Sequence, residues 1–123
     1  MPFLNNDLLV SLKLKVNLAL LALCGSAGWS WAGGSGLNVA VVVNRNDTNS
    51  VQLGNYYCDQ RQVPPQNLLR INWTGGNVEW SKADFETRLL NPLTEMLASR
   101  GLSNQVDTVV LSMDIPYRVT HSG

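Results

Sequence analysis

The sequence contains little cysteine or histidine and no excess of charge of either sign. Its 123 residues include two cysteines and a single histidine, His121, and nine basic side chains balance nine acidic ones. These few cysteine and histidine side chains have no metal-ligand spacing, so we predict no metal site and no cofactor. A balanced charge gives no electrostatic reason to expect nucleic acid as a partner. No glycine-rich phosphate loop follows the first predicted strand, so the common nucleotide-binding motifs are not expected either.

Long hydrophobic runs are also missing. The most apolar stretch, residues 16–23, is interrupted by an asparagine and is far shorter than the ~20 residues of a membrane-spanning helix. Two lysines precede it, and Ser30 and Ala32 put small side chains at the two positions that a signal peptidase reads. We therefore predict that residues 1–32 are a secretion signal cleaved after Ala32, which leaves an exported protein with no stable membrane span.

Two alternatives stay open for this N-terminal segment. Without cleavage, the apolar run would remain as a membrane anchor. In addition, Leu21-Ala22-Leu23-Cys24 resembles the lipoprotein processing box, in which the cysteine is lipidated. A small residue normally precedes that cysteine, whereas here it is Leu23, so lipidation of Cys24 is kept as the alternative. The expected location is the periplasm, the cell surface or the extracellular space.

The part after the predicted cleavage site has one cysteine, Cys58, and cannot form an internal disulfide. It carries seven basic and eight acidic side chains, because Lys13, Lys15 and Asp7 lie in the predicted signal. Small exported domains commonly depend on disulfides. This domain must therefore be stabilised by its hydrophobic core or belong to something larger.

Hydrophobic periodicity predicts alternating strands and helices. The valine-rich first strand is apolar on both faces, whereas the second alternates apolar and polar side chains. The predicted elements are a flexible lead-in at residues 33–36, strands at residues 37–43, 68–73 and 106–113, and helices at residues 50–61 and 81–100.

The first predicted helix is expected to be capped by Asn49 or Ser50. Gly54 costs about 1 kcal/mol of helix stability relative to alanine, and a close approach of the helix to the sheet is the expected compensation. At 100° per residue, one side of this helix collects the residues expected to be buried, namely Val51, Leu53, Gly54, Tyr57 and Cys58.

The second predicted helix is expected to start after Ser81 as its cap and to end at Gly101. Pro92 lies in its middle and is expected to kink it or split it in two. Its buried stripe is predicted to be Phe85, Leu89, Leu93, Met96 and Leu97.

This alternation predicts an α/β fold in which parallel strands are joined by right-handed crossovers. A strand that is apolar on both faces belongs in the middle of a sheet, and a strand with one wet face is suited to an edge. The predicted spatial order is therefore second–first–third, the flavodoxin-like order 2-1-3, with one helix on each face of the sheet.

Three strands and two helices bury little apolar surface, and the third strand is too apolar for a free edge. We expect residues 37–123 to be the N-terminal part of a truncated α/β domain, an incomplete three-layer β-α-β-α-β fragment. The alternative is a complete small protein that pairs with a partner.

The predicted topology also indicates where a ligand would bind. In parallel sheets, ligands bind beyond the carboxyl ends of the strands, here between the first and third strands. Amides and carboxylates in this crevice could exchange hydrogen bonds with a polar ligand, and Arg118 could clamp an anion. The candidate ligand-binding residues are Asn44, Asn46, Asp47, Asp114 and Arg118, with Arg45, Ser112 and Tyr117 beside them. The alternative is that Asn44, Asn46 and Asp47 only cap the turn and the helix that follows.

Other residues that can carry chemistry are weaker candidates. Cys58 on a helix face is expected to be a small core residue. Ser112 has no histidine or acid at a recognisable spacing and is not predicted to be a nucleophile. Four aromatic residues are expected to pack in the core rather than to form a carbohydrate surface: Tyr56, Tyr57, Trp73 and Trp80.

Several segments form a combination of motifs: Val43-Asn44-Arg45-Asn46, Ser50, Asn55-Tyr56-Tyr57 with Arg61, Val63-Pro64-Pro65-Gln66-Asn67, and Ile115-Pro116-Tyr117-Arg118-Val119. This combination, which covers residues 41–119, resembles an uncharacterised family of exported bacterial proteins. The members of that family are several times longer, so the resemblance implies that this chain is an N-terminal part. Where the family often has glycine before Ile-Pro, this chain has Asp114. The family has no assigned activity, so the resemblance implies no catalytic residue.

The expected function is that of an exported protein whose α/β domain binds or hydrolyses an extracellular polymer or peptide. One alternative is a non-catalytic envelope or surface module that binds a partner. Another is the beginning of a caspase-like or gingipain-like protease, which needs a histidine after the third strand and a cysteine after the fourth. His121 is roughly placed for the first of these, and only fold analogy supports this alternative.

Overall fold

The structure is a computed structural model that describes residues 34–121. The predicted secretion signal, its cleavage site after Ala32 and the alternative lipidation site at Cys24 lie outside the described residues. Within the described part, no helix combines the length and the apolar character that crossing a bilayer would require. Short 3₁₀ turns, η1 (Gly36–Asn38) and η2 (Pro65–Asn67), precede the first two strands.

The main sheet has three parallel strands in the predicted order. β1 (Val39–Asn44) lies between β2 (Leu68–Ile71) and β4 (Thr108–Leu111), and it pairs with both in parallel. All six residues of β1 are buried, as expected for a strand covered on both faces. The flavodoxin-like arrangement predicted for the three strands is therefore confirmed.

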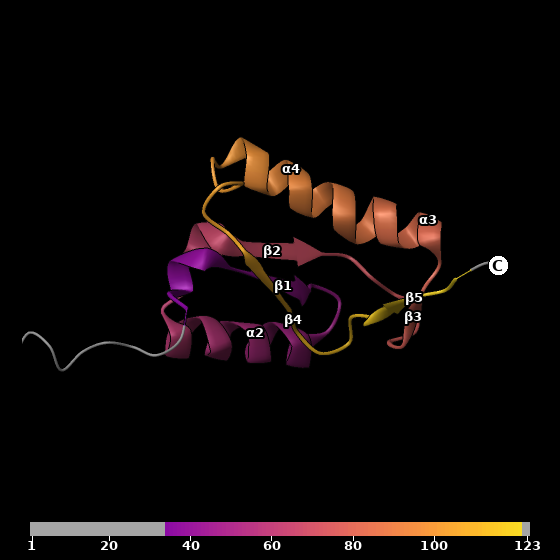
Figure 1. Cartoon of the computed structure of the whole chain (residues 1–123). Helices are drawn as coiled ribbons and strands as arrows, with labels where there is room; N and C mark the ends of the chain where they lie inside the picture. The colour runs from indigo at the N-terminus through magenta and orange to yellow at the C-terminus, as the bar shows by residue number, and fades with distance from the viewer. Residues whose placement is uncertain (1–33, 122–123) are drawn as a thin grey trace, which may run out of the picture. The chain divides into compact units, whose positions relative to one another are not determined.

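Helices cover the two faces of this sheet separately (Figure 1). On one face, α2 (Thr48–Arg61) packs over a cluster formed by alternate residues of β1 with Val63 and Leu68. On the other face lies a second helical stretch, made of α3 (Lys82–Asp84), the π-helical segment η3 (Phe85–Leu90) and α4 (Asn91–Ser99). The intervening β1 residues pack there with the predicted stripe of the second helix, of which Leu89, Leu93 and Met96 are buried and Phe85 and Leu97 partly buried. The three-layer prediction is confirmed.

The start of α2 differs from the prediction. Asp47, rather than Asn49 or Ser50, is the N-cap, and its Oδ1 accepts a hydrogen bond of 2.6 Å from the Ser50 amide. A carboxylate is a good cap because it also faces the positive end of the helix dipole. The hydroxyl of Ser50 is used elsewhere, because it accepts a hydrogen bond of 2.9 Å from the backbone N–H of Asn44.

Close contact between α2 and β1 requires Gly54. This glycine is buried, and a Cβ at its position would overlap the Cγ1 of Val43. The predicted compensation for a glycine inside a helix is therefore confirmed. Leu53 does not follow its prediction: it is 47% exposed, because it lies toward the open side of β4, where no described element covers it.

The second helical stretch is continuous, and Pro92 is accommodated without a break. A proline ring inside an α-helix meets the carbonyl four residues earlier, which here belongs to Arg88. The helix widens into η3 just before this point, and the Asn91 amide bonds to the carbonyl of Glu86, five residues back. The other predictions hold: Ser81 caps the start, and Gly101 adopts a positive φ of 66° where the helix ends.

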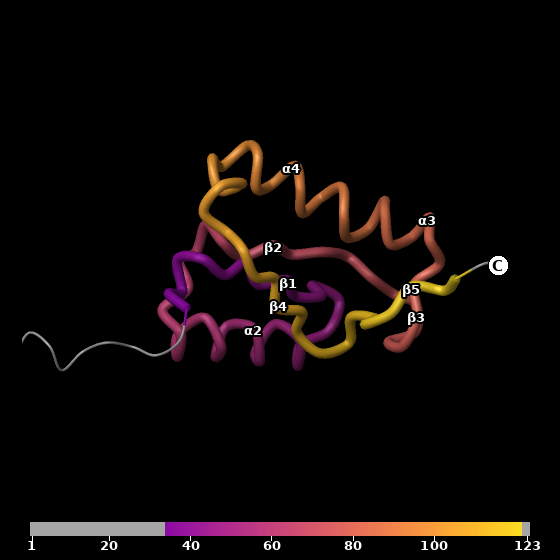
Figure 2. Tube along the Cα trace, viewed as in Figure 1, coloured from indigo at the N-terminus to yellow at the C-terminus, as the bar shows by residue number. Residues whose placement is uncertain are grey.

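A second, two-stranded parallel sheet was not predicted. β3 (Glu79–Trp80) pairs with β5 (Arg118–Val119), and Figure 2 follows the chain from the end of β4 to this pair. Trp80 is 1% exposed and donates a 2.8 Å hydrogen bond from Nε1 to the Pro116 carbonyl. The Thr120 amide and hydroxyl both bond to the Trp80 carbonyl. Trp80 therefore anchors the C-terminal segment to the rest of the domain.

Candidate functional site

A polar cleft lies at the carboxyl ends of the strands of the main sheet. The arrows of β1 and β2 in Figure 1 point toward this end. The cleft has a volume of about 490 Å³. Its lining comes from three segments: Asn44 at the end of β1 with Asn46 and Asp47 in the following loop, residues 73–77 after β2, and Asp114 after β4. The structure thus brings together four of the five predicted site residues.

Asn44 forms the floor of the cleft and is 4% exposed. Its Nδ2 donates to the carbonyls of Trp73 (3.0 Å) and Asp114 (3.2 Å). Its Oδ1 accepts from the amides of Asn46 (3.2 Å) and Trp73 (3.1 Å). All of its donors and acceptors are therefore satisfied within the protein, and Asn44 joins the three loops rather than presenting groups to a ligand.

Asn46 and Asp47 keep polar atoms on the cleft surface. Asn46 is exposed, and its Nδ2 makes a long, 3.4 Å contact with the Trp73 carbonyl. Asp47 is half-buried and uses Oδ1 to cap α2. The capping alternative thus describes Asn44 and one oxygen of Asp47, while the side chains of Asn46 and Asp47 also line the cleft.

Asp114 is a non-glycine residue with a left-handed backbone, at a φ of 57°. This conformation favours glycine, and aspartate is among the few other residues that adopt it. Asp114 is therefore compatible with a turn position at which glycine would otherwise be favoured. The turn carries the Asp114 carbonyl to Asn44 and leaves the side chain at the cleft.

Arg118 was expected to clamp an anion in this crevice, but it lies in β5 and is not part of the cleft lining. Its guanidinium pairs with the Glu79 carboxylate at 2.6 Å, because the pairing of β5 with β3 places the two residues opposite each other. Without it, the lining carries two carboxylates, Asp47 and Asp114, and no cationic side chain. Such a surface repels anionic ligands.

The loop at residues 73–77 is the part of the site that the sequence reasoning missed. Thr74-Gly75-Gly76-Asn77 follows the carboxyl end of a strand, where ligands bind, but none of these residues was among the predicted site residues. Trp73 fixes this loop, because its Nε1 donates a 2.7 Å hydrogen bond to the Gly76 carbonyl. On its other side it packs against Trp80, with ring centroids 4.3 Å apart. The prediction of core packing is confirmed for Trp80, whereas Trp73 is partly buried and also lines the cleft, and Tyr56 is 63% exposed.

Two residues with reactive side chains are held in structural positions. Ser112 is buried, and its hydroxyl donates a 2.6 Å hydrogen bond to the Ser50 carbonyl, which ties β4 to the first turn of α2. For Cys58, burial raises the pKa of the thiol, and the nearby charge of Asp59 raises it further. A thiol with a raised pKa is a poor nucleophile near neutral pH, which agrees with a core role.

Comparisons with known proteins identify no relative: no family model matches the chain, and no curated protein or solved structure is significantly similar to it. Among residues 34–121, no three histidine, cysteine, aspartate or glutamate side chains gather as possible metal ligands. The geometry of the cleft is therefore the basis for a functional proposal.

Proposed function

We propose that this chain is an exported α/β protein that binds a neutral, hydroxyl-rich polymer segment in the cleft at the carboxyl edge of its main sheet. Export is supported by the sequence pattern of residues 1–32. Ligand binding is supported by one observation above all: three loops converge on a cleft of about 490 Å³ and line it with polar groups. Ligand sites commonly have volumes of this order.

The chemistry of the lining favours a ligand rich in hydroxyl groups. The carboxylates of Asp47 and Asp114 accept hydrogen bonds, and the amides of Asn46 and Asn77 both donate and accept. A hydroxyl group also donates and accepts, so it matches either kind of partner. Two carboxylates in a lining with no cationic side chain disfavour phosphates and uronic acids. A neutral polysaccharide segment fits these conditions.

Binding is favoured over hydrolysis. The carboxylate of Asp47 is engaged by the Ser50 amide as a helix cap, which restrains its movement toward a reacting group. The Ser112 hydroxyl donates to a backbone carbonyl and does not line the cleft. The proposed function therefore needs only recognition by positioned polar groups.

The proposal can be tested by titrating the protein with cellohexaose and following Trp73 and the cleft amides by fluorescence and NMR. Asp114→Asn keeps the size of the side chain and tolerates the left-handed backbone. Asp114→Asn and Asn46→Ala are each expected to weaken binding about fivefold to tenfold, the effect of one lost hydrogen bond of about 1 to 1.5 kcal/mol. Asn55→Ala, an exposed amide on α2 outside the cleft, is the matched control and should bind normally.

Two comparisons decide the outcome. Oligogalacturonate of the same length should bind more weakly than cellohexaose, because its carboxylates meet those of Asp47 and Asp114. Shifts confined to residues outside the cleft, tighter binding of oligogalacturonate, or unchanged affinity in both cleft variants would contradict the proposal.

A further inference from the structure

β4 is an open edge of the main sheet, and its four residues include no charged side chain and no proline. Natural edge strands are blunted by charged residues, proline or bulges, which prevent pairing with another chain. The four residues of β4 are Thr-Val-Val-Leu. Val109 is 42% exposed, and Val110 and Leu111 are only partly buried. Such an edge is suited to pairing rather than to solvent.

The opposite edge of the same sheet is protected. β2 carries the exposed side chain of Arg70. Arg100 also donates hydrogen bonds to the carbonyls of Gln66 and Leu68 at the start of this strand. The two edges therefore differ, and of the two only β4 is open to pairing with another strand.

The backbone of β4 has a defined outward pattern. The Ser112 amide donates to the Val42 carbonyl at 2.9 Å, so Ser112 and, by alternation, Val110 direct their backbone groups toward β1. Along a strand, the intervening residues point the other way. The N–H and C=O groups of Val109 and Leu111 therefore face the open edge.

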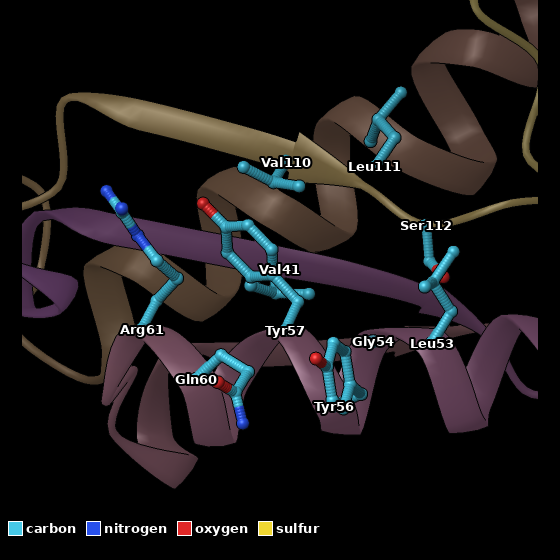
Figure 3. Close-up of a pocket in the computed structure, with 10 residues that line it drawn as sticks. All are labelled: Val41, Leu53, Gly54, Tyr56, Tyr57, Gln60, Arg61, Val110, Leu111 and Ser112. Atoms are coloured by element: carbon cyan, nitrogen blue, oxygen red, sulfur yellow. The ribbon is translucent and has the colours of Figure 1, made fainter.

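An apolar groove accompanies this edge. Between α2 and β4 lies a hollow of about 300 Å³, whose walls include Leu53, Tyr57 and Val110 (Figure 3). Tyr56 beside it is 63% exposed, and Leu53 is 47% exposed. The edge of β4 and the apolar groove between α2 and β4 are thus both uncovered. A partner that pairs with the edge would also lie beside the groove.

We propose that a second copy of this chain occupies the β4 edge, in an antiparallel arrangement about a two-fold axis that passes between the two Val110 residues. In this register, Val109 of one copy lies opposite Leu111 of the other, and the two residues exchange a pair of backbone hydrogen bonds. The two-fold axis repeats this pair between Leu111 of the first copy and Val109 of the second. Val110 then faces Val110 across the axis. The alternation in β4 permits this closed pairing, and the sheet becomes continuous across both copies.

The rest of the surface suits the same symmetry. A strand spacing of about 4.8 Å places the two β1 strands about 14 Å apart, so the two α2 helices lie on one face with the apolar grooves between them. The helices run antiparallel. The carboxyl end of one, with Arg61, therefore lies on the same side as the amino end of the other, where Asp47 is the cap. Arg61 makes no ion pair among residues 34–121, so its charge is free to complement the acidic cap of the other helix.

Cysteine crosslinking tests the register. In the full chain with Cys24→Ser and Cys58→Ala, Val110→Cys places two thiols at a non-hydrogen-bonded antiparallel pair, where Cα atoms are about 4.5 Å apart and a disulfide can form. Mild oxidation should convert this variant to a covalent dimer at least about tenfold faster than Thr108→Cys. The Thr108 control lies opposite Ser112 of the second copy and cannot reach its own equivalent.

Sedimentation equilibrium tests the association itself. The chain should be a dimer, and Val109→Lys should raise its dissociation constant at least about tenfold, because an ammonium group would be buried at the interface. Val119→Lys, at a similarly exposed valine of β5, is the control and should remain dimeric. Circular dichroism verifies that both variants are folded.

Three results would overturn the proposal: a wild-type monomer at high protein concentration, equal crosslinking of the two cysteine variants, or a dimer unaffected by Val109→Lys. A monomer whose β4 edge is covered only when further polypeptide is supplied would assign the edge to an additional strand instead.

Discussion

Two residues of the domain hold a left-handed backbone although they are not glycine. Gln62 has a φ of 52° and ends α2, and its amide bonds back to the carbonyls of Cys58 and Asp59. Asp114 has a φ of 57° and turns the chain after β4. A left-handed conformation costs most residues about 1 to 2 kcal/mol. At Asp114 this strained conformation occurs at a residue whose side chain lines the cleft. Strained backbone conformations are common at binding sites.

This strain predicts opposite effects of two substitutions at Asp114. Asp114→Gly should raise the free energy of unfolding by about 0.5 kcal/mol, and Asp114→Ala should lower it by about 1 kcal/mol. Both changes delete the carboxylate, so the difference between the two variants isolates the backbone effect. Urea denaturation measures it. Gln62→Gly should stabilise the protein in the same way, and equal stabilities of the two Asp114 variants would show that the turn relaxes instead.

At the scale of elements, the contact between α2 and β1 determines how the domain packs. α2 packs on a strand with six buried residues, and at Gly54 its backbone lies directly against the Val43 side chain. A larger residue at this position must push the helix away from the sheet or displace the valine. Because Ser50 and Ser112 connect the same helix to β1 and β4 through hydrogen bonds, a shift of α2 would also strain those contacts.

Gly54→Ala should therefore lower the free energy of unfolding by about 1 to 3 kcal/mol, as overpacking does in cores. Helix propensity alone predicts the opposite, a gain of about 1 kcal/mol. The sign of the measured change separates the two effects. Asn55→Ala, at the exposed neighbouring position, should give a small gain. Stabilisation by Gly54→Ala would mean that α2 moves without cost.

At the scale of the whole molecule, the layers and the strand order could be predicted because they depend on periodicity. The valine run of β1 and the single wet face of β2 were sufficient for the order of the sheet. The strands of the second sheet have two residues each, which is too short for any periodic signal. The position of Arg118 could not be predicted for that reason.

The candidate site was predictable only in its location. The rule that ligands bind at carboxyl ends of parallel strands brought Asn44, Asn46, Asp47 and Asp114 to one edge. Which of them is structural and which is open to a ligand depends on the hydrogen bonds of Asn44 to residues 29 and 70 positions away in the sequence. Periodicity does not predict such long-range hydrogen bonds. The loop after β2 was overlooked for the same reason, because it is joined to Asn44 across 29 residues of sequence.

Through those long-range hydrogen bonds, Asn44 connects the end of β1 to the loops that follow β2 and β4. Asn44→Ala would leave a buried gap and deprive the loops after β2 and β4 of their partners, so the free energy of unfolding should fall by about 2 to 4 kcal/mol. Asn46→Ala, on the exposed rim, should change it by less than about 0.5 kcal/mol. NMR of the folded Asn44→Ala protein should show shifts at both Trp73 and Asp114, since one side chain holds both carbonyls. Shifts limited to the loop after β1 would mean that each loop is stable by itself, and the cleft would then be a meeting of independent segments rather than a preorganised site.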